Sequence, residues 1–257
     1  MARIEEVAKG IYRICTFEPG FGISVNQFLI GDECPALIHT GMFPMYEDVR
    51  GAVAEVMDPK RLAYVVVPHF EADECGGMDR FVEEAPEAVL ACGEAGAMIN
   101  LSGWDYSGPV RGFRDGDTVD LGEHKLRFME TPHVHHWDSM MVFEENTGSL
   151  FPADLFAQPG DQPPIVRENL GKEACEMSRE VGIFAAEWPV LKVVDRIEEL
   201  APSWIHPMHG GSLPREAIHY YLDALRNEPF AFDGRLFGRT LPGFPAPAEA
   251  DPTLERS

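Results

Sequence analysis

The spacing of apolar positions along the chain predicts alternating strands and helices. Short runs rich in β-branched and aromatic residues, bounded by Gly, Pro, Asp or Asn, are typical of strands. Residues 62–67 form a continuous apolar run, which is typical of a strand buried on both faces. The predicted strands cover residues 11–17, 23–30, 36–38, 62–67, 88–92, 119–121, 126–130, 140–144, 149–152 and 204–206.

Helices are predicted where apolar residues recur about once per turn. Val49, Val53 and Val56 follow this spacing within residues 44–57, and Pro44 suits the start of that helix. The other predicted helices cover residues 76–84, 94–101, 177–200 (with an interruption expected at Pro189) and 215–227. Because strands in both halves alternate with helices, we predict an α+β fold. Two mixed sheets would pack together, with helices on their outer faces.

The chain of 257 residues is predicted to form one domain and a short tail. Its length would allow one or two domains, but no Pro/Ser-rich linker interrupts residues 1–240. Residues 241–257 are rich in Pro and Ala, a composition typical of a tail rather than a packed core.

The composition narrows the classes of function. Hydrophobic residues make up 45% of the chain, which excludes a disordered protein. The formal net charge of −22 argues against partners with phosphate backbones or anionic lipid surfaces, and so against nucleic acid and membrane. Glu5 and Glu6 stand where a signal peptide would have an apolar core, so we expect a cytoplasmic protein. The five cysteines are irregularly spaced and lack a C-x-x-C pair, which argues against disulfides and thiolate zinc sites.

Candidate metal ligands directly follow the apolar run at 62–67. His69, Glu71 and Asp73 occupy alternate positions, and alternate side chains of an extended backbone point the same way. Gly76-Gly77 then allows a tight turn into the next helix. The pattern therefore predicts three converging ligands, although a solvated loop would show the same residue types.

Three later segments carry further candidates. Residues 133–136 contain three histidines; His133 and His135 would share one face of an extended segment, and His136 would point away. Asp154 lies in an apolar stretch, where a lone carboxylate needs a partner. His209 precedes a diglycine after the last predicted strand. A surface histidine cluster, a salt bridge and a loop histidine are the respective alternatives.

The order of these motifs resembles the flavodiiron proteins of the metallo-β-lactamase-fold superfamily, from residue 25 through His209. Hydrolases of that superfamily carry H-x-H-x-D-H after the buried strand, whereas flavodiiron proteins carry H-x-E-x-D-H. This chain has the second pattern over residues 69–73. The family's T-P-x-x-H-x-x-D-S-M, L-F-x-x-D-x-F and final H-G motifs match residues 131–140, 150–156 and 209–210. The resemblance implies a metallo-β-lactamase-like αββα sandwich.

Carried over by position, the resemblance implies a centre of two iron ions. His69, Glu71 and His135 would hold one iron, Asp73 and His209 the other, and Asp154 would bridge them. Zinc or manganese are alternative metals, since imidazole and carboxylate ligands suit all three.

Three further residues are candidate ligands or supports for ligands. Glu74 replaces the family's last motif histidine, and His39 replaces the aspartate that usually precedes Thr-Gly. Glu74 could add a carboxylate ligand or turn away from the centre. His133 is the third candidate.

The resemblance also implies the function. We expect a non-haem diiron protein that binds or activates dioxygen, acting either as an O2 sensor or carrier or as an O2 or NO reductase with an external electron donor. A signalling protein is the expected partner of a sensor, and a homodimer is possible. The sequence ends too soon after His209 for a flavodoxin domain, so no bound flavin is expected. A binuclear metallohydrolase and a metal-free binding module are the alternatives.

Overall fold

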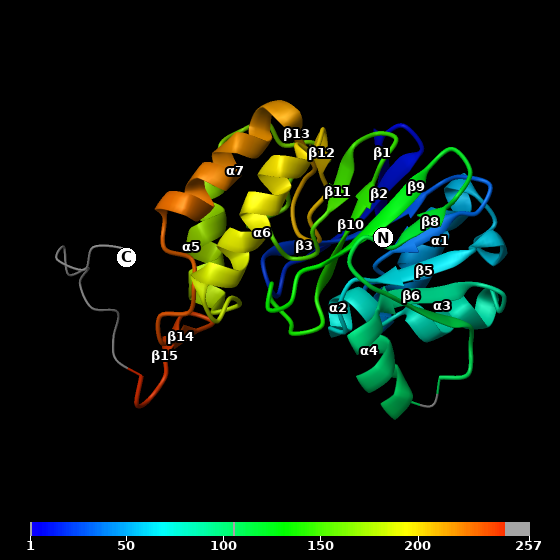
Figure 1. Ribbon diagram of the computed structural model, residues 1–257, viewed down its shortest axis with the longest axis horizontal. Helices are drawn as coiled ribbons and strands as arrows, with labels where there is room; N and C mark the ends of the chain where they lie inside the picture. Colours follow the sequence, from blue (N-terminus) through cyan, green and yellow to red (C-terminus); the bar gives the residue numbers. More distant parts are fainter. Residues whose placement is uncertain (1, 105, 245–257) are drawn as a thin grey trace.

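Two large sheets form the centre of the molecule in the computed structural model, which describes residues 2–104 and 106–244 (Figure 1). The first sheet has seven strands in the order β1-β2-β3-β4-β5-β6-β7. Its first four strands pair antiparallel, and β4 through β7 pair parallel. The strands are β1 (Arg3–Ala8), β2 (Ile11–Glu18), β3 (Ile23–Ile30), β4 (Ala36–Ile38), β5 (Tyr64–Val67), β6 (Val89–Gly93) and β7 (Val110–Phe113).

The second sheet has six strands in the order β13-β12-β11-β10-β9-β8. All neighbours pair antiparallel except β11 and β12, which are parallel. The strands are β8 (Thr118–Asp120), β9 (Lys125–Glu130), β10 (Met140–Glu144), β11 (Ser149–Phe151), β12 (Trp204–Ile205) and β13 (Leu213–Pro214). A small hairpin, β14 (Arg235–Leu236) and β15 (Arg239–Thr240), follows the last helix.

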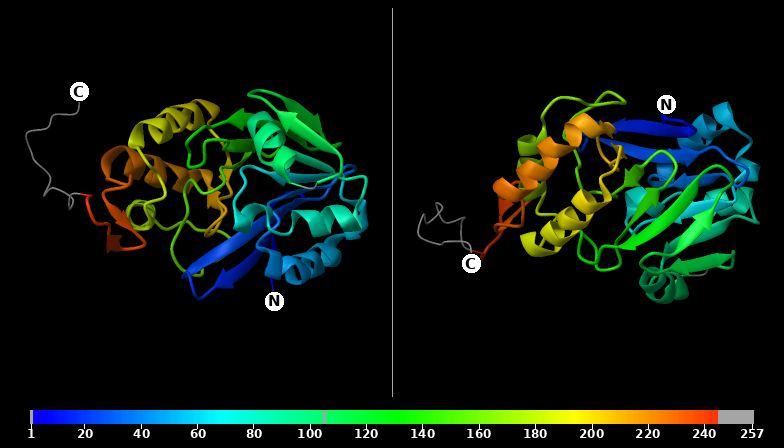
Figure 2. Two further views of the ribbon diagram at one scale, coloured as in Figure 1. Left: turned by 90° about the horizontal axis from the view of Figure 1, so that it is seen from below. Right: turned by 45° about the horizontal axis from the view of Figure 1, so that its top comes forward.

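Helices cover the outer face of each sheet (Figure 2). On the first sheet these are α1 (Tyr46–Val56) and α3 (Met78–Glu84), and on the second α5 (Gly171–Val181), α6 (Glu187–Leu200) and α7 (Arg215–Asn227). The shorter helices are η1 (Phe43–Met45), η2 (Pro59–Arg61), α2 (Ala72–Cys75), α4 (Glu94–Ile99) and η3 (Leu101–Gly103).

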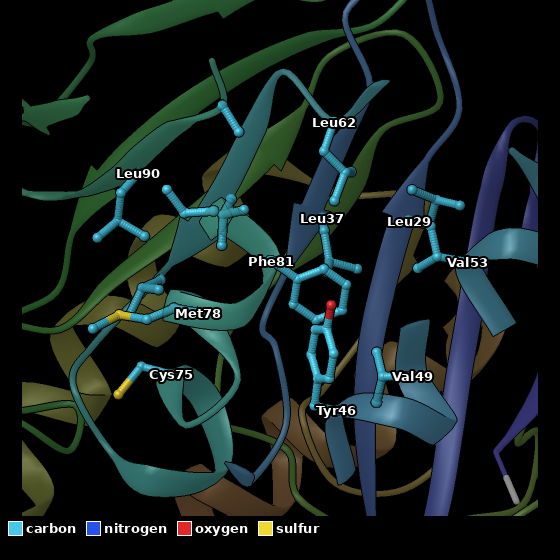
Figure 3. Close-up of a cluster of buried hydrophobic side chains, with 14 of the residues drawn as sticks. Leu29, Leu37, Tyr46, Val49, Val53, Leu62, Cys75, Met78, Phe81 and Leu90 are labelled. Carbon is cyan, nitrogen blue, oxygen red and sulfur yellow. The ribbon is translucent and has the colours of Figure 1, made fainter. Parts of the chain in front are cut away.

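Alternation along the strands divides the core into three layers. Phe28 and Val142 point between the sheets, whereas Leu29 contacts the α1 and α3 side and Met141 the α5 to α7 side. Figure 3 shows the first outer layer, in which the Tyr46 ring packs edge-on against the Phe81 ring of α3. The two mixed sheets with outer helices confirm the predicted αββα sandwich.

The sequence pattern missed three strands of the two large sheets, and it also missed the β14–β15 hairpin. Residues 3–8 and 110–113 form the two edges of the first sheet, and most of their side chains remain at least partly exposed. Edge strands of this kind lack the apolar alternation that a pattern search requires. Strand β13 contains only two residues, Leu213 and Pro214.

The predicted single helix over 177–200 is wrong in detail. Helix α5 begins at Gly171 and ends before Gly182, which adopts the left-handed conformation at φ 77°. Helix α6 starts five residues later, and Pro189 lies in its first turn, where its missing N–H leaves no helical hydrogen bond unmade. The chain therefore breaks at Gly182 and not at Pro189.

The remaining predictions about organisation concern the ends of the described chain. Of the predicted tail at 241–257, residues 245–257 lie outside the described residues, so the tail stays a prediction. None of the helices within residues 2–104 and 106–244 is both long and apolar enough to cross a membrane.

Candidate metal centre

The candidate ligands leave the ends of strands at one edge of the sandwich. His69 follows β5, His135 lies in the loop between β9 and β10, Asp154 follows β11, and His209 follows β12. Strands β11 and β12 are parallel, and β10 is antiparallel to both β9 and β11. Strands β9, β11 and β12 therefore run in the same direction, and the loops that follow them leave the second sheet at the same end of the strands. The end of β5 and helix α2 lie near the middle of the view in Figure 1.

The first ligand motif is less extended than the sequence predicts. Glu71 is extended at φ −126° and ψ 154°, but helix α2 begins at the next residue and includes Asp73 and Glu74. Acidic side chains are favourable in the first turn of a helix, because they face its positive end. Asp73 therefore reaches the site from a helical turn and not from an extended strand.

Asp154 lies at the centre of the cluster and faces three imidazole rings. Its Oδ2 is 2.9 Å from His135 Nε2 and 3.3 Å from His69 Nε2. Its Oδ1 is 3.0 Å from His209 Nε2. Only 4% of the Asp154 side chain is exposed, so its charge has little access to water.

Two more carboxylates complete two groups of donors. Glu71 Oε2 lies 3.3 Å from His69 Nε2 and 3.1 Å from His135 Nε2. Asp73 Oδ2 lies 3.3 Å from His209 Nε2. One group thus contains two histidines and a glutamate, the other contains one histidine and an aspartate, and each faces a different oxygen of Asp154.

Protonation of the cluster follows from this geometry. Burial disfavours the charged form of Asp154, but hydrogen bonds from the surrounding histidines outweigh it and hold the pKa of Asp154 well below its usual range. Hydrogen bonds from His135 and His69 lower the pKa of Glu71 to about 2. Burial lowers the pKa of His135, yet hydrogen bonds to Asp154 and Glu71 raise it overall to about 9. The clustered carboxylates therefore require positive charge at the imidazole Nε2 atoms.

A metal ion would supply the same charge, and the donor set fits one. Three imidazole nitrogens and three carboxylates converge without a thiolate, which suits iron, manganese or zinc. His209 Nδ1 donates a hydrogen bond to the Ser24 carbonyl oxygen at 2.7 Å. This hydrogen bond fixes the tautomer in which His209 Nε2 can bind a metal.

The three supporting candidates differ in their positions. Glu74 and His39 are fully buried, and Glu74 contacts the backbone N–H of His69 at 3.1 Å. His133 is exposed, and within the described part of the chain it forms no ion pair with the cluster.

His136 belongs to the cluster although the sequence predicted that it would point away. Its ring centroid is 4.8 Å from that of His69, and its Nε2 is 4.0 Å from Glu71 Oε2. His69, Glu71, His135 and His136 can each offer a donor atom within 4.8 Å of the others. The prediction failed because residues 131–139 form turns, to which strand alternation does not apply.

Comparison with known proteins identifies the family. The family described as "ODP family beta lactamase" matches residues 23–210, which include all six candidate ligands. This chain is a member of the ODP family. The match agrees with the metallo-β-lactamase fold and the flavodiiron-like motifs predicted from the sequence, and both predictions are confirmed.

Curated relatives of this ODP family member include several named redox proteins. It is 31% identical over 140 residues to the "Nitric oxide reductase" of Moorella thermoacetica, covering 53% of this chain and 35% of the relative. It is 27% identical over 200 residues to the "Rubredoxin-oxygen oxidoreductase" of Megalodesulfovibrio gigas, covering 74% of this chain and 49% of the relative. The "Flavo-diiron protein FprA2" of Clostridium acetobutylicum is 27% identical over 206 residues, covering 77% of this chain and 51% of the relative. The chain thus spans about half or less of these relatives.

Solved structures share the fold. The rubredoxin oxygen:oxidoreductase of Desulfovibrio gigas superposes with a TM-score of 0.79 at 21% identity, covering 87% of this chain and 60% of that one. A fragment of residues 1–254 of putative diflavin flavoprotein A 5 from Nostoc sp. PCC 7120 gives a TM-score of 0.73 at 19% identity. That comparison covers 88% of this chain and 96% of the fragment. The ODP family member therefore has the fold of a flavodiiron core.

Proposed function

We propose that this chain is a non-haem diiron protein that binds or activates O2, or reduces O2 or NO. His69, Glu71 and His135 would hold one iron, Asp73 and His209 the other, and Asp154 would join them. The observation that carries the proposal is the division of the donors into two groups around Asp154. His69 and His135 face its Oδ2, and His209 faces its Oδ1.

Two iron ions in such a site would supply electrons to a diatomic gas and a place for it to bind. The chain would contribute charge and orientation. Glu71, Asp73 and Asp154 bring three negative charges, and anionic oxygen donors favour the more highly charged state of a metal. His209 is fixed by Ser24, which keeps its Nε2 directed toward Asp154.

The names of the relatives support a gas as the substrate. One curated relative is named for nitric oxide reduction and another for transfer of electrons from rubredoxin to oxygen. We propose by analogy that an external electron donor or a signalling partner serves this chain. A cytoplasmic location, a possible homodimer and the absence of bound flavin remain predictions from the sequence.

The proposal is tested by loading the protein anaerobically with two Fe(II) per chain and then adding O2 or NO. We expect uptake of two irons per chain and a visible absorption change on addition of gas. A long-lived change would favour a sensor or carrier, and a transient change would favour turnover with a donor. The variant His219→Ala removes an exposed histidine of α7 that is not among the candidate ligands. It serves as a control for the loss of a histidine and should take up iron and respond to gas like the parent.

Another result would contradict the proposal. A protein that takes up zinc but no iron, shows no response to gas and cleaves phosphoesters or thioesters would be a binuclear metallohydrolase. Glu71 argues against that alternative, because it occupies the position of a histidine in the hydrolase motif described above.

A further inference from the structure

A buried acid–imidazole pair lies behind the candidate metal centre. His39 follows β4 and Glu74 belongs to α2, and both side chains are 0% exposed. His39 Nδ1 is 3.4 Å from Glu74 Oε1. Neither atom has a hydrogen-bond partner among the described residues, and each lies within ion-pair distance of the other. A carboxylate removed from water in this way requires such a partner.

The other oxygen of Glu74 contacts His69. Glu74 Oε2 accepts a hydrogen bond from the backbone N–H of His69 at 3.1 Å and lies 3.2 Å from His69 Nδ1. The opposite nitrogen, His69 Nε2, faces Glu71 and Asp154. Glu74 therefore contacts His69 on the side of the ring away from the two carboxylates of the centre.

Backbone hydrogen bonds hold the pair in place. The Glu74 carbonyl oxygen accepts from the Thr40 N–H at 2.7 Å and from Thr40 Oγ1 at 2.9 Å. The His39 N–H donates to the Val66 carbonyl oxygen of β5 at 3.0 Å. Residues 39 and 40 are thus attached both to the strand that leads to His69 and to the helix that carries Glu74.

We propose that Glu74 is a positioning residue that orients His69, with His39 as its buried partner, and that it is not a metal ligand. This inference rests on the proposed metal centre. The chain departs from the flavodiiron pattern at positions 39 and 74 together, with an imidazole in place of an acid at the first and an acid in place of an imidazole at the second. Because the two side chains face each other in this structure, we treat the two departures as one exchange of an acid for an imidazole.

The exchange has a consequence for the centre. Without Glu74, the proposed second iron would have three ligands from the chain, namely Asp73, His209 and Asp154. The first would have four, namely His69, Glu71, His135 and Asp154. The second iron would therefore retain more positions for a small ligand from solution.

The first test asks whether Glu74 is a ligand, because His69, Glu74 and Asp154 can also offer donor atoms within 4.8 Å of one another. The full chain carrying Glu74→Gln is loaded with Fe(II) and separately with Co(II). We expect two metals per chain, an unchanged Co(II) visible spectrum and metal loss to a chelator that is about tenfold faster than in the parent. One metal per chain, or a Co(II) spectrum of altered coordination, would overturn the proposal. Glu55→Gln, exposed on α1, is the matched control.

The second test exchanges the pair. His39→Asp and Glu74→His are made singly and together; position 39 has φ 62°, which aspartate tolerates better than most residues. We expect each single variant to lose metal faster and to unfold at a lower temperature, and the double variant to recover both properties in part. A double variant no better than the sum of the singles would overturn the pairing.

The two tests also separate this inference from the proposed function. Thermal unfolding of the metal-free variants reports the coupling between positions 39 and 74 without any metal. If the parent binds no iron but the exchange restores stability, the diiron proposal fails and the buried pair stands. If the parent binds two irons but the exchange restores nothing, the pairing fails and the diiron proposal stands.

Discussion

Asp154 is the residue on which the candidate centre depends. Its two oxygens face imidazoles from both donor groups, and its side chain is 4% exposed. A buried carboxylate in contact with three histidines is stabilised only if positive charge is shared among them. Removing this side chain therefore disturbs both groups, whereas removing any one histidine disturbs one.

We expect Asp154→Ala to lose both metals and the optical response to gas together. Without Asp154, both donor groups lose the one carboxylate that they share. Metal content is measured by elemental analysis after gel filtration, with His219→Ala as the control. Retention of two metals per chain would show that Asp154 does not join the two positions.

His206 is also buried, but it lies outside the candidate centre and its role is structural. Its two ring nitrogens contact Ser212 Oγ at 2.8 Å and Ser149 Oγ at 3.1 Å. Burial is the main cause that lowers the pKa of His206 to about 3, from 6.5. Between these two values the unfolded chain binds a proton that the folded chain does not, so the free energy of unfolding falls as the pH is lowered.

From this shift we expect a pH dependence that His206→Gln removes. Between about pH 7.5 and about pH 5.5, His206 should cost the parent about 1.4 kcal/mol of stability that the variant does not lose. Urea unfolding of the metal-free proteins at the two pH values gives the difference. An equal loss in parent and variant would contradict the assigned pKa.

Residue types predicted the candidate site better than local geometry did. Six side chains named from the sequence lie together, because histidine and carboxylate at strand ends are informative without knowledge of the loops. The direction of His136 could not be predicted, since it depends on turns in residues 131–139. The contact between His39 and Glu74 could not be predicted either, because it depends on how α2 is placed against the end of β4.

At the scale of elements, the position of α2 depends on a close approach of backbones. A Cβ atom added to Gly76 would lie 2.4 Å from the Ala72 carbonyl oxygen and 2.6 Å from the Phe43 nitrogen. Both neighbours are backbone atoms, so relief requires movement of α2 or η1. Helix α2 carries Asp73 and Glu74, so such movement also reaches the candidate centre.

We expect Gly76→Ala to destabilise the protein by more than about 2 kcal/mol and to weaken metal binding. Gly51→Ala is the matched control, because Gly51 lies within α1 with nothing within 4 Å of the added atom. Alanine there should stabilise the protein by about 0.5–1 kcal/mol, since it favours the helix. Denaturant unfolding measures both effects, and equal stability of the two variants would contradict the proposed crowding.

Elements with strong apolar patterns were predictable and those at the edges were not. The buried strand β5 and the amphipathic helix α7 follow the expected periods closely. Strands β1 and β7 each form hydrogen bonds with one neighbouring strand of the first sheet, and most of their side chains are exposed or half-buried. The break at Gly182 was missed because a left-handed residue, rather than a proline, ends the helix.

At the scale of the whole molecule, charge distinguishes among electron donors. The net charge of −22 creates a negative field that repels anions and attracts cations over about 10 Å at 0.1 M salt. If the proposed iron centre is present, its reduction from outside must occur against this field. A donor with a positive contact surface is therefore favoured over an acidic one.

We expect cationic and anionic redox mediators to show opposite dependence on salt. Added salt should slow reduction of the iron-loaded protein by the cationic mediator and speed reduction by the anionic one, because it screens attraction and repulsion alike. Stopped-flow absorbance gives the rates, and an uncharged mediator is the control. The reverse pattern would indicate a local positive surface at the point of electron entry.

The order of the candidate ligands along the chain also bears on biosynthesis. His69 lies in the first third of the sequence, and His209 follows β12 near the end of the folded body. A chain emerging from the ribosome therefore exposes three ligands of the first motif long before the last histidine exists. The donor set closes only when the two halves have met, so a tightly held metal would mark a molecule in which residues 69–209 have been made and have folded together.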